Sequence, residues 1–268
     1  MKIPFAGPSI TDLEIKYVTD AVKTGWYTKM SEYTSKFEKA TSKYVGSTYA
    51  LSSFCATHSL HLAVKILFRP GDEVICPDIS WIATAAAISY VGATPVFVDV
   101  DNYWNIDPKA IENAITKKTK GIMLVHMFGM PCDMTSIMKL AKKYNLKVIE
   151  DAAPALGSLY KRRKCGSFGD IGCFSFQGAK IAVSGEGGIL VTKNKKLYEK
   201  ATYFASMCRT DRKATFWCDD LGFEYPIANM VAACGLAQIE RIEELVENKR
   251  KIFNWYYERL KKHSSIEY

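Results

Sequence analysis

The sequence predicts an α/β fold, a three-layer sandwich with a mostly parallel central sheet. Short apolar runs rich in Val and Ile alternate with helical patterns between residues 57 and 191. Such alternation gives parallel strands covered by helices on both faces, with ligands beyond the carboxyl ends of the strands. The composition agrees, because 268 residues with 48% hydrophobic and 24% charged content can bury a substantial core as an ordinary globular protein.

The predicted elements follow one another in regular order. Four strands, at 73–76, 95–98, 121–125 and 147–149, alternate with helices at 57–67, 81–90, 108–115 and 133–144. Two later apolar segments, 170–176 and 187–191, are expected to be strands on either side of Lys180. From residue 229 to about 262 the helical pattern barely breaks, which predicts a single element of roughly 50 Å.

An acid at the end of a strand and a lysine downstream of it suggest a cofactor site. The apolar run 146–151 ends in Asp151, and the segment 173–180 ends in Lys180. A buried carboxylate can keep a pyridinium nitrogen protonated, and an enclosed lysine can form an imine with an aldehyde. The pair therefore suggests pyridoxal 5'-phosphate (PLP). Taken singly, Asp151 is more simply a helix N-cap and Lys180 a solvated surface charge.

A long motif around the pair favours the cofactor interpretation. Residues 149–188 read IEDAAPALGSLYKRRKCGSFGDIGCFSFQGAKIAVSGEGG. This run resembles the signature of the PLP-dependent nucleotide-sugar aminotransferases of the DegT/DnrJ/StrS type, which have PLP fold type I. The segments IPFAGPSIT, PGDEVICPDISWIATAAAISYVGATPVFVDVD and CGLAQIERI resemble the same family. The GDP-perosamine-synthase-like branch is the most similar.

The resemblance implies roles for three residues. Lys180 falls where the family has the catalytic lysine that forms the imine with PLP, and Asp151 where it has the partner of the pyridine nitrogen. Trp81 falls where an aromatic ring stacks on the cofactor, since a flat ring held parallel to the pyridine fixes its tilt. Without the resemblance, a core tryptophan would be the better interpretation of Trp81.

The resemblance also places the cofactor phosphate at the start of the helix near Cys55, where free N–H groups and the helix dipole favour an anion. Thr57 and Ser175 match family hydroxyls there. Ala56 stands where the family commonly has Gly, and its methyl group is expected to crowd this loop. Pro154 stands where many members have a polar residue, so a hydrogen bond to cofactor or substrate is lost there.

Asn229 resembles a residue that reaches the cofactor phosphate of the neighbouring subunit, which implies a homodimer with the active site at the interface. Its alternative interpretation is a helix N-cap, because an apolar periodic run begins at Met230.

The implied activity is transamination with PLP as the cofactor. Glutamate gives its amino group and leaves as 2-oxoglutarate, and the acceptor is a nucleotide-diphosphate keto sugar, a 4-keto-6-deoxyhexose that becomes a 4-amino sugar for polysaccharide or glycan synthesis. Related PLP-dependent sugar dehydratases have His in place of the lysine, so Lys180 argues against dehydration. A non-catalytic PLP-fold protein, acting as a dimer partner or regulator, is the alternative from another class.

The domain organisation is expected to be incomplete. Residues 1–240 would form the large PLP-binding domain, and 241–268 a long helix leading toward a small C-terminal domain of about a hundred residues. The chain ends where that domain would begin, so we expect a truncated or split enzyme. A site left open to water loses orientation and desolvation, which would lower activity.

Composition excludes several other classes. The eight cysteines are scattered without a C-x-x-C motif, which favours reduced thiols over a disulfide or metal scaffold. The net charge of +8 is spread along the chain, so no nucleic-acid partner is expected. The basic cluster 161–164 is interpreted first as a solvated β-turn and second as a site that attracts the diphosphate of a nucleotide sugar. No apolar run is long enough for a membrane span and no leader is evident, so we expect a cytoplasmic protein.

Overall fold

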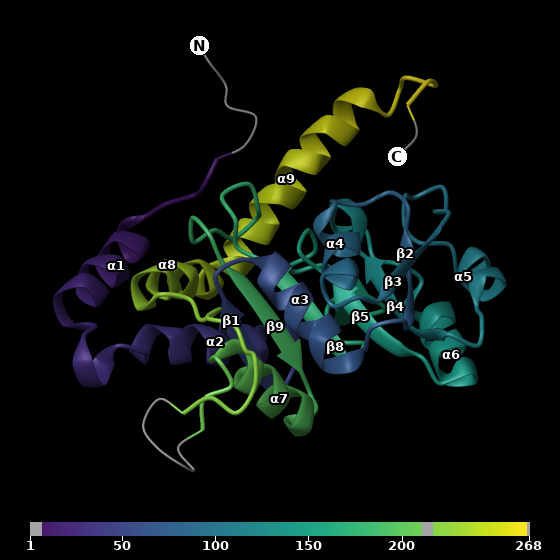
Figure 1. Ribbon diagram of the computed structural model, residues 1–268. Helices are drawn as coiled ribbons and strands as arrows, with labels where there is room; N and C mark the ends of the chain where they lie inside the picture. Colours follow the sequence, from purple (N-terminus) through teal and green to yellow (C-terminus); the bar gives the residue numbers. More distant parts are fainter. Residues whose placement is uncertain (1–6, 211–216, 267–268) are drawn as a thin grey trace.

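A seven-stranded sheet forms the centre of the molecule, in the order β1-β9-β8-β5-β4-β2-β3 (Figure 1). The computed structural model describes residues 7–210 and 217–266. The strands are β1 (Tyr49–Ser53), β2 (Glu73–Pro77), β3 (Thr94–Val98), β4 (Thr119–Val125), β5 (Lys147–Asp151), β8 (Ile171–Ser175) and β9 (Gly188–Thr192). Neighbours from β3 to β8 pair in parallel, whereas β9 runs antiparallel to both β8 and β1. The prediction of a mostly parallel sheet is confirmed.

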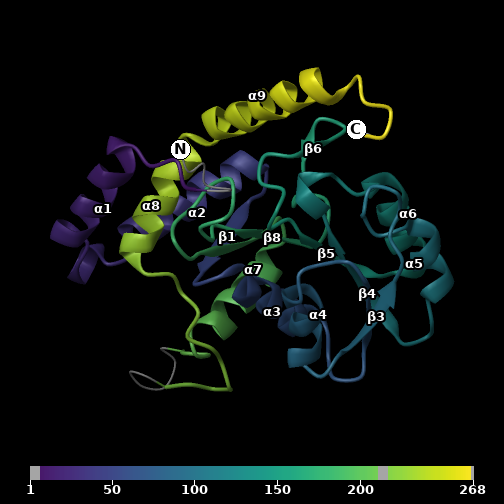
Figure 2. The same ribbon diagram turned by 90° about the horizontal axis from the view of Figure 1, so that it is seen from above.

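Helices cover both faces of the sheet and make three layers (Figure 2). On one face, α3 (Ala56–Leu67), α4 (Ala83–Tyr90) and α7 (Lys195–Ala205) share a core with the strands. On the other, α5 (Pro108–Ala114) and α6 (Met134–Tyr144) pack over β2, β4 and β5. Beside them, α1 (Asp12–Thr24), α2 (Glu32–Val45) and α8 (Asn229–Glu240) cover β1, β8 and β9.

The two-sided core explains why the strands read as continuous apolar runs. In β5, Val148 packs into the core under α5 and α6, whereas Ile149 packs into the core under α3 and α4. Consecutive strand residues point to opposite faces, so a strand covered on both sides has to be apolar at every position. The strands and helices predicted between residues 57 and 191 all occur, with ends that differ by two residues or fewer.

The basic cluster 161–164 forms the turn of a small hairpin. It joins β6 (Leu159–Tyr160) to β7 (Arg163–Lys164), which pair antiparallel. Lys161 and Arg162, the two turn residues, have φ of 47° and 69°. Positive φ at both central positions is the geometry of a tight two-residue hairpin turn, so the β-turn interpretation of this cluster is confirmed.

The C-terminal helical pattern forms two helices, not one. The chain bends at Arg241, with φ −102° and ψ 8°, between α8 and α9 (Ile242–Leu260). The prediction of one 50 Å element was wrong, because the hydrophobic pattern continues across a bend at which α8 and α9 each turn an apolar face to the same core. The start of α9 is buried in that core through Ile242, Leu245 and Val246. Its distal part extends away from the body (Figure 1), with exposed aromatic residues such as Phe253 and Trp255.

Two further observations concern the classes considered above. Over residues 7–210 and 217–266, no helix is long and apolar enough to cross a membrane. Five cysteines are buried free thiols, at positions 76, 132, 165, 173 and 208.

Candidate active site

Asp151 lies at the carboxyl end of β5 and is only 5% exposed. Its Oδ2 accepts a hydrogen bond of 2.8 Å from Thr84 Oγ1, and its Oδ1 accepts one of 3.1 Å from the backbone N–H of Ala153. The chain continues from β5 through turns to the hairpin at β6. Asp151 therefore does not cap a helix, and this alternative interpretation was wrong.

The surroundings of Asp151 favour a cation beside it. Burial raises the pKa of its carboxyl above the ordinary value of 3.8, against the hydrogen bonds from Thr84 and Ala153 and the charge of Lys180. A carboxylate held in so dry a place is stabilised by any positive group that approaches its free side. A protonated ring nitrogen is such a group.

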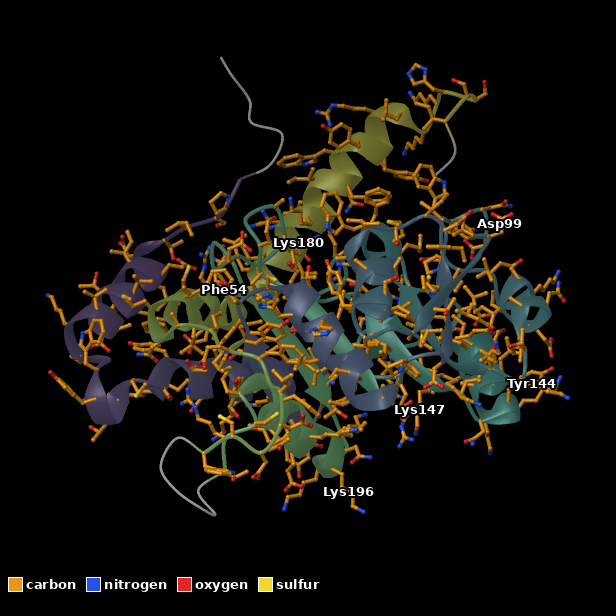
Figure 3. All side chains as sticks on the ribbon, in the orientation of Figure 1. Phe54, Asp99, Tyr144, Lys147, Lys180 and Lys196 are labelled. Atoms are coloured by element: carbon orange, nitrogen blue, oxygen red, sulfur yellow. The ribbon has the colours of Figure 1, made fainter. Side chains whose placement is uncertain are left out.

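Lys180 lies in the loop between β8 and β9, and it is half-buried. Its backbone N–H donates to the carbonyl of Gln177 at 2.8 Å, and an isolated bridge between Gln177 and Gly185 closes the loop. The charge of Lys180 acts against the rise in the pKa of Asp151, so the fold places Lys180 within electrostatic reach of that carboxyl. Figure 3 shows Lys180 near the middle of the molecule.

The amino end of α3 lies against the same edge of the sheet. Gly188, the first residue of β9, pairs with Ser175 on one side and with Ser53 on the other. A Cβ atom on Gly188 would lie 2.3 Å from the carbonyl of Cys55 and 2.6 Å from the backbone nitrogen of Ala56. A side chain at residue 188 would therefore displace the start of α3. Glycine here lets Ser175 and the start of α3 lie side by side.

The start of α3 favours negative charge. Burial raises the pKa of the Cys55 thiol, but the side chain and backbone of His58 and the backbone N–H of Thr57 outweigh it and lower the pKa. Free N–H groups at the beginning of a helix also stabilise phosphate. Ala56 is the first residue of the helix, so its backbone has a conformation that any residue adopts, and the Gly common in the family is not needed for φ.

Trp81 lies just before α4, and its side chain is 78% exposed. The interpretation as a core tryptophan was therefore wrong. Its carbonyl accepts from the backbone N–H of Thr84 at 3.1 Å, and Thr84 is the residue that holds Asp151. The turn of chain after β2 thus carries both an exposed aromatic ring, Trp81, and the hydroxyl group that binds Asp151.

Asn229 contacts residues from the N-terminal part of the chain, Tyr33 and Gly25. The N-cap of α8 is Ala228, and Asn229 is the first helical residue, so the N-cap interpretation was wrong by one position. Its Oδ1 accepts from the backbone N–H of Tyr33 at 2.9 Å. Its buried Nδ2 has no hydrogen-bond partner among the described residues and lies close to Gly25. A role toward a neighbouring subunit stays a prediction.

Pro154 follows Asp151 in the turn after β5 and is half-buried. It has neither a side-chain donor nor a backbone N–H, so it leaves the two hydrogen bonds to Asp151 as they are and adds none.

A buried hydrogen bond between His126 and Glu150, behind Asp151, was missed by the sequence reasoning. His126 Nε2 lies 3.0 Å from Glu150 Oε2, and both side chains are fully buried. The backbone N–H of Cys132 donates to His126 Nδ1 at 3.1 Å, so Nε2 is the nitrogen that donates to Glu150. Glu150 also accepts from three backbone N–H groups, those of Gly166, Phe168 and Gly169.

The pair connects three segments of the site. The backbone N–H of His126 donates to the carbonyl of Asp151 at 3.2 Å, while Glu150 fixes the loop that leads into β8. The signal in the sequence was an acid directly before Asp151, inside an otherwise apolar strand. An acid in that place needs buried donors, and the structure provides four of them.

The geometry fits pyridoxal phosphate in three ways. A buried carboxylate can hold a pyridine nitrogen protonated, a lysine lies within electrostatic reach of that carboxylate, and the start of α3, which favours negative charge, lies against the same edge of the sheet. The cofactor brings a ring nitrogen, an aldehyde and a phosphate, one for each of these groups. The carboxylate, the lysine and the start of α3 lie at the carboxyl edge of the sheet, where ligands of open α/β folds bind.

Comparison with known proteins agrees with the site. Residues 8–268 match the DegT/DnrJ/EryC1/StrS aminotransferase family. The chain is 43% identical to GDP-perosamine synthase of Escherichia coli O157:H7 over 95% of its length and 70% of the relative. It is 40% identical to GDP-perosamine synthase of Caulobacter vibrioides over 97% of its length and, again, 70% of the relative.

Solved structures match the fold as well. Helicobacter pylori PseC, an aminotransferase involved in the biosynthesis of pseudoaminic acid, superposes with a TM-score of 0.93 at 28% identity, over 98% of this chain and 72% of that one. A putative sugar aminotransferase of Streptococcus pneumoniae, Spr1654 in its PLP form, superposes with a TM-score of 0.89 at 28% identity, over 97% and 72%.

Proposed function

We propose, since the chain belongs to the DegT/DnrJ/EryC1/StrS aminotransferase family, that it binds pyridoxal phosphate and transfers an amino group from glutamate to a nucleotide-linked 4-keto-6-deoxyhexose. The observation that supports this most directly is the placement of Lys180 near the buried carboxylate of Asp151 at the carboxyl edge of the sheet. When bound, the cofactor supplies an aldehyde that takes up and passes on the amino group, and a ring that stabilises negative charge at the reacting carbon.

In this proposal Asp151 keeps the ring nitrogen protonated. Its carboxylate is oriented by Thr84 and Ala153 and is shielded from water, so its interaction with a ring N–H is strong. Lys180 would hold the cofactor covalently, and its Nζ, when released, would be the base that carries the proton taken from the donor carbon. The exposed ring of Trp81 would stack on the pyridine and orient it.

The phosphate in this proposal lies at the start of α3. The backbone N–H groups of Ala56 and Thr57, with the hydroxyl groups of Thr57 and Ser175, bind it there. A second copy of the chain completes the site across a homodimer interface, where Asn229 of one copy reaches toward the phosphate bound by the other. The identity of 43% and 40% to GDP-perosamine synthases supports a GDP-linked keto sugar as the acceptor.

The test is to add pyridoxal phosphate to the purified chain, reduce with borohydride and map the labelled peptide. We expect the label on Lys180, and its loss in Lys180→Ala and in Lys180→Arg, which retains the positive charge. A label on another lysine with Lys180 unmodified would refute the assignment. Incubation with ¹⁵N-glutamate and a GDP-linked 4-keto-6-deoxyhexose should then give a ¹⁵N-labelled amino sugar.

The alternative function is that of a non-catalytic partner or regulator. The labelling experiment with pyridoxal phosphate and borohydride distinguishes it from the enzyme, because a partner protein need not bind the cofactor. Binding of pyridoxal phosphate at Lys180 without transfer of ¹⁵N to any keto sugar would favour this alternative over the enzyme.

A further inference from the structure

We propose that Gln238 is a positioning residue for Lys180, because its buried side-chain amide fixes the loop from 177 to 187. This inference rests on the proposed role of Lys180. Gln238 lies on α8 and is fully buried. Its Oε1 accepts a hydrogen bond of 3.1 Å from the backbone N–H of Val183, three residues after Lys180. The other end of the amide binds two groups near the start of the chain.

The neighbours of Gln238 determine which way its amide points. Nε2 donates to Glu14 Oε1 at 2.7 Å and to the carbonyl of Ser9 at 2.8 Å. Carboxylate and carbonyl oxygens only accept, whereas the N–H of Val183 only donates. The NH₂ group must therefore face Glu14 and Ser9, and the oxygen must face Val183. Only a side-chain amide has donors on one side and an acceptor on the other in this arrangement.

The loop depends on this contact because the hydrogen bonds among residues 176–187 join the loop only to itself, whereas Gln238 joins it to α8. Phe176 donates to the carbonyl of Gly187 and accepts from Ser184, each at 2.8 Å, and Gly178 donates to Gly185 at 3.1 Å. These bonds close the loop at its base. Val183 makes two bonds to α8. Its backbone N–H donates to Gln238, and its carbonyl accepts from Cys234 Sγ at 3.6 Å. Lys180 lies between these two sets of ties.

Charge keeps the far end of Gln238 in place. Burial alone raises the pKa of Glu14, but hydrogen bonds from Thr11, Arg241 and Gln238 outweigh it and lower the pKa to about 2. Glu14 is therefore ionised at neutral pH, and a hydrogen bond to an ionised acceptor is shorter and stronger than one between neutral groups. The amide of Gln238 thus joins a fixed anion on α1 to the lysine loop.

The experiment compares Gln238→Met, which has similar length and volume but no amide, with Thr192→Val. The control removes another buried hydrogen bond, 2.7 Å from Thr192 Oγ1 to the carbonyl of Asp170, without touching the lysine loop. The first readout needs no cofactor: we expect amide hydrogen exchange at Val183 to become about tenfold faster in Gln238→Met, as loss of one hydrogen bond predicts, and to stay unchanged in the control.

The second readout is the concentration of pyridoxal phosphate that half-labels Lys180 under borohydride. We expect it to rise about tenfold in Gln238→Met and to stay within twofold in Thr192→Val, since misplacement of the reacting amine costs orientation. Faster exchange at Val183 with normal labelling of Lys180 would limit Gln238 to an anchoring role and overturn the proposal. Unchanged exchange would overturn it as well.

A second variant covers loss of folding. Gln238→Glu retains an acceptor for Val183 but places a carboxylate beside Glu14, so we expect exchange at Val183 closer to that of the unmodified chain than in Gln238→Met. Unfolding of both variants, seen by circular dichroism, would assign the amide to stability alone and overturn the positioning role. If the unmodified chain is not labelled at Lys180, the proposed function fails, and the exchange result still reports on the loop.

Discussion

Replacing Glu14 with Gln tests the network that joins α1, α8 and α9. One carboxylate oxygen accepts from Thr11, through N–H at 2.7 Å and through Oγ1 at 2.6 Å. The other accepts from Arg241 Nη1 at 2.8 Å and from Gln238 at 2.7 Å. Glu14 is only 2% exposed, so the neutral amide of Glu14→Gln would present donors to groups that themselves donate.

The magnitude follows from the pKa of Glu14, which is about 2 in the fold against a model-compound value of 4.5. A lowered pKa means that the ionised form stabilises the fold above the unfolded value and that this stabilisation is lost as the pH falls toward 2. Each pKa unit corresponds to about 1.36 kcal/mol, so the carboxylate contributes about 3 kcal/mol at pH 7 and about 1.5 kcal/mol at pH 3. At pH 7, Glu14→Gln should lower the melting temperature by roughly 6–12 °C.

The assay is urea unfolding of both proteins at pH 7 and at pH 3, with Glu244→Gln as the matched control. Glu244 is an exposed carboxylate that binds the same Arg241 at 2.9 Å, and a surface pair of this kind contributes little. We expect the difference in unfolding free energy for Glu14→Gln to shrink by about half between pH 7 and pH 3. A difference that does not change with pH, or one as small as that of Glu244→Gln, would refute the reasoning.

Three other predictions concern the site. Thr84→Val removes the hydroxyl donor from the buried Asp151, so the pKa of that carboxyl should rise further. The loss in melting temperature should be largest at neutral pH, where the carboxyl is ionised, and should shrink as the pH falls. A loss independent of pH would contradict this prediction. Gly188→Ala should weaken binding of pyridoxal phosphate at least tenfold, because the added Cβ meets the backbone of Cys55. Gly178→Ala is the control, since Gly178 has open space around it, and it should bind the cofactor normally. Equal affinities of the two variants would disprove the steric argument. Glu150→Gln leaves buried N–H groups without their charged acceptor and should cost about 1–3 kcal/mol in urea unfolding. The exposed Glu112→Gln should change little, and a cost as small as that of this control would show that the buried donors do not need the carboxylate.

Much of the fold could be predicted because each signal is local. A strand covered on both faces needs apolar residues at consecutive positions, as in β4 and β5, and a helix needs them at intervals of three and four. Such patterns do not depend on the rest of the chain. The bend at Arg241 was missed for the same reason, since α8 and α9 both face the core and the apolar period continues through the bend.

The candidate site divides in the same way. Asp151 and Lys180 were chosen for their chemistry and for a motif that resembles a known family. Thr84 and Gln238 carry no such signal, because a threonine and a glutamine in a helix have ordinary explanations. Glu150 carries one, as an acid inside an apolar strand, but the sequence does not identify its partner. What distinguishes them is a partner far away in sequence: Asp151 for Thr84, His126 for Glu150, and Val183 together with Glu14 for Gln238.

The sequence by itself thus determined the α/β class, the positions of the strands between residues 57 and 191, and the acid and the lysine that suggest pyridoxal phosphate. Apolar periodicity and residue chemistry are properties of short segments, so no folded chain is needed to read them. The tertiary structure decided the order of the strands, the burial that raises the pKa of Asp151, and the hydrogen bonds that hold the Lys180 loop. These depend on which distant segments exclude water from one another, and only the folded chain brings those segments together.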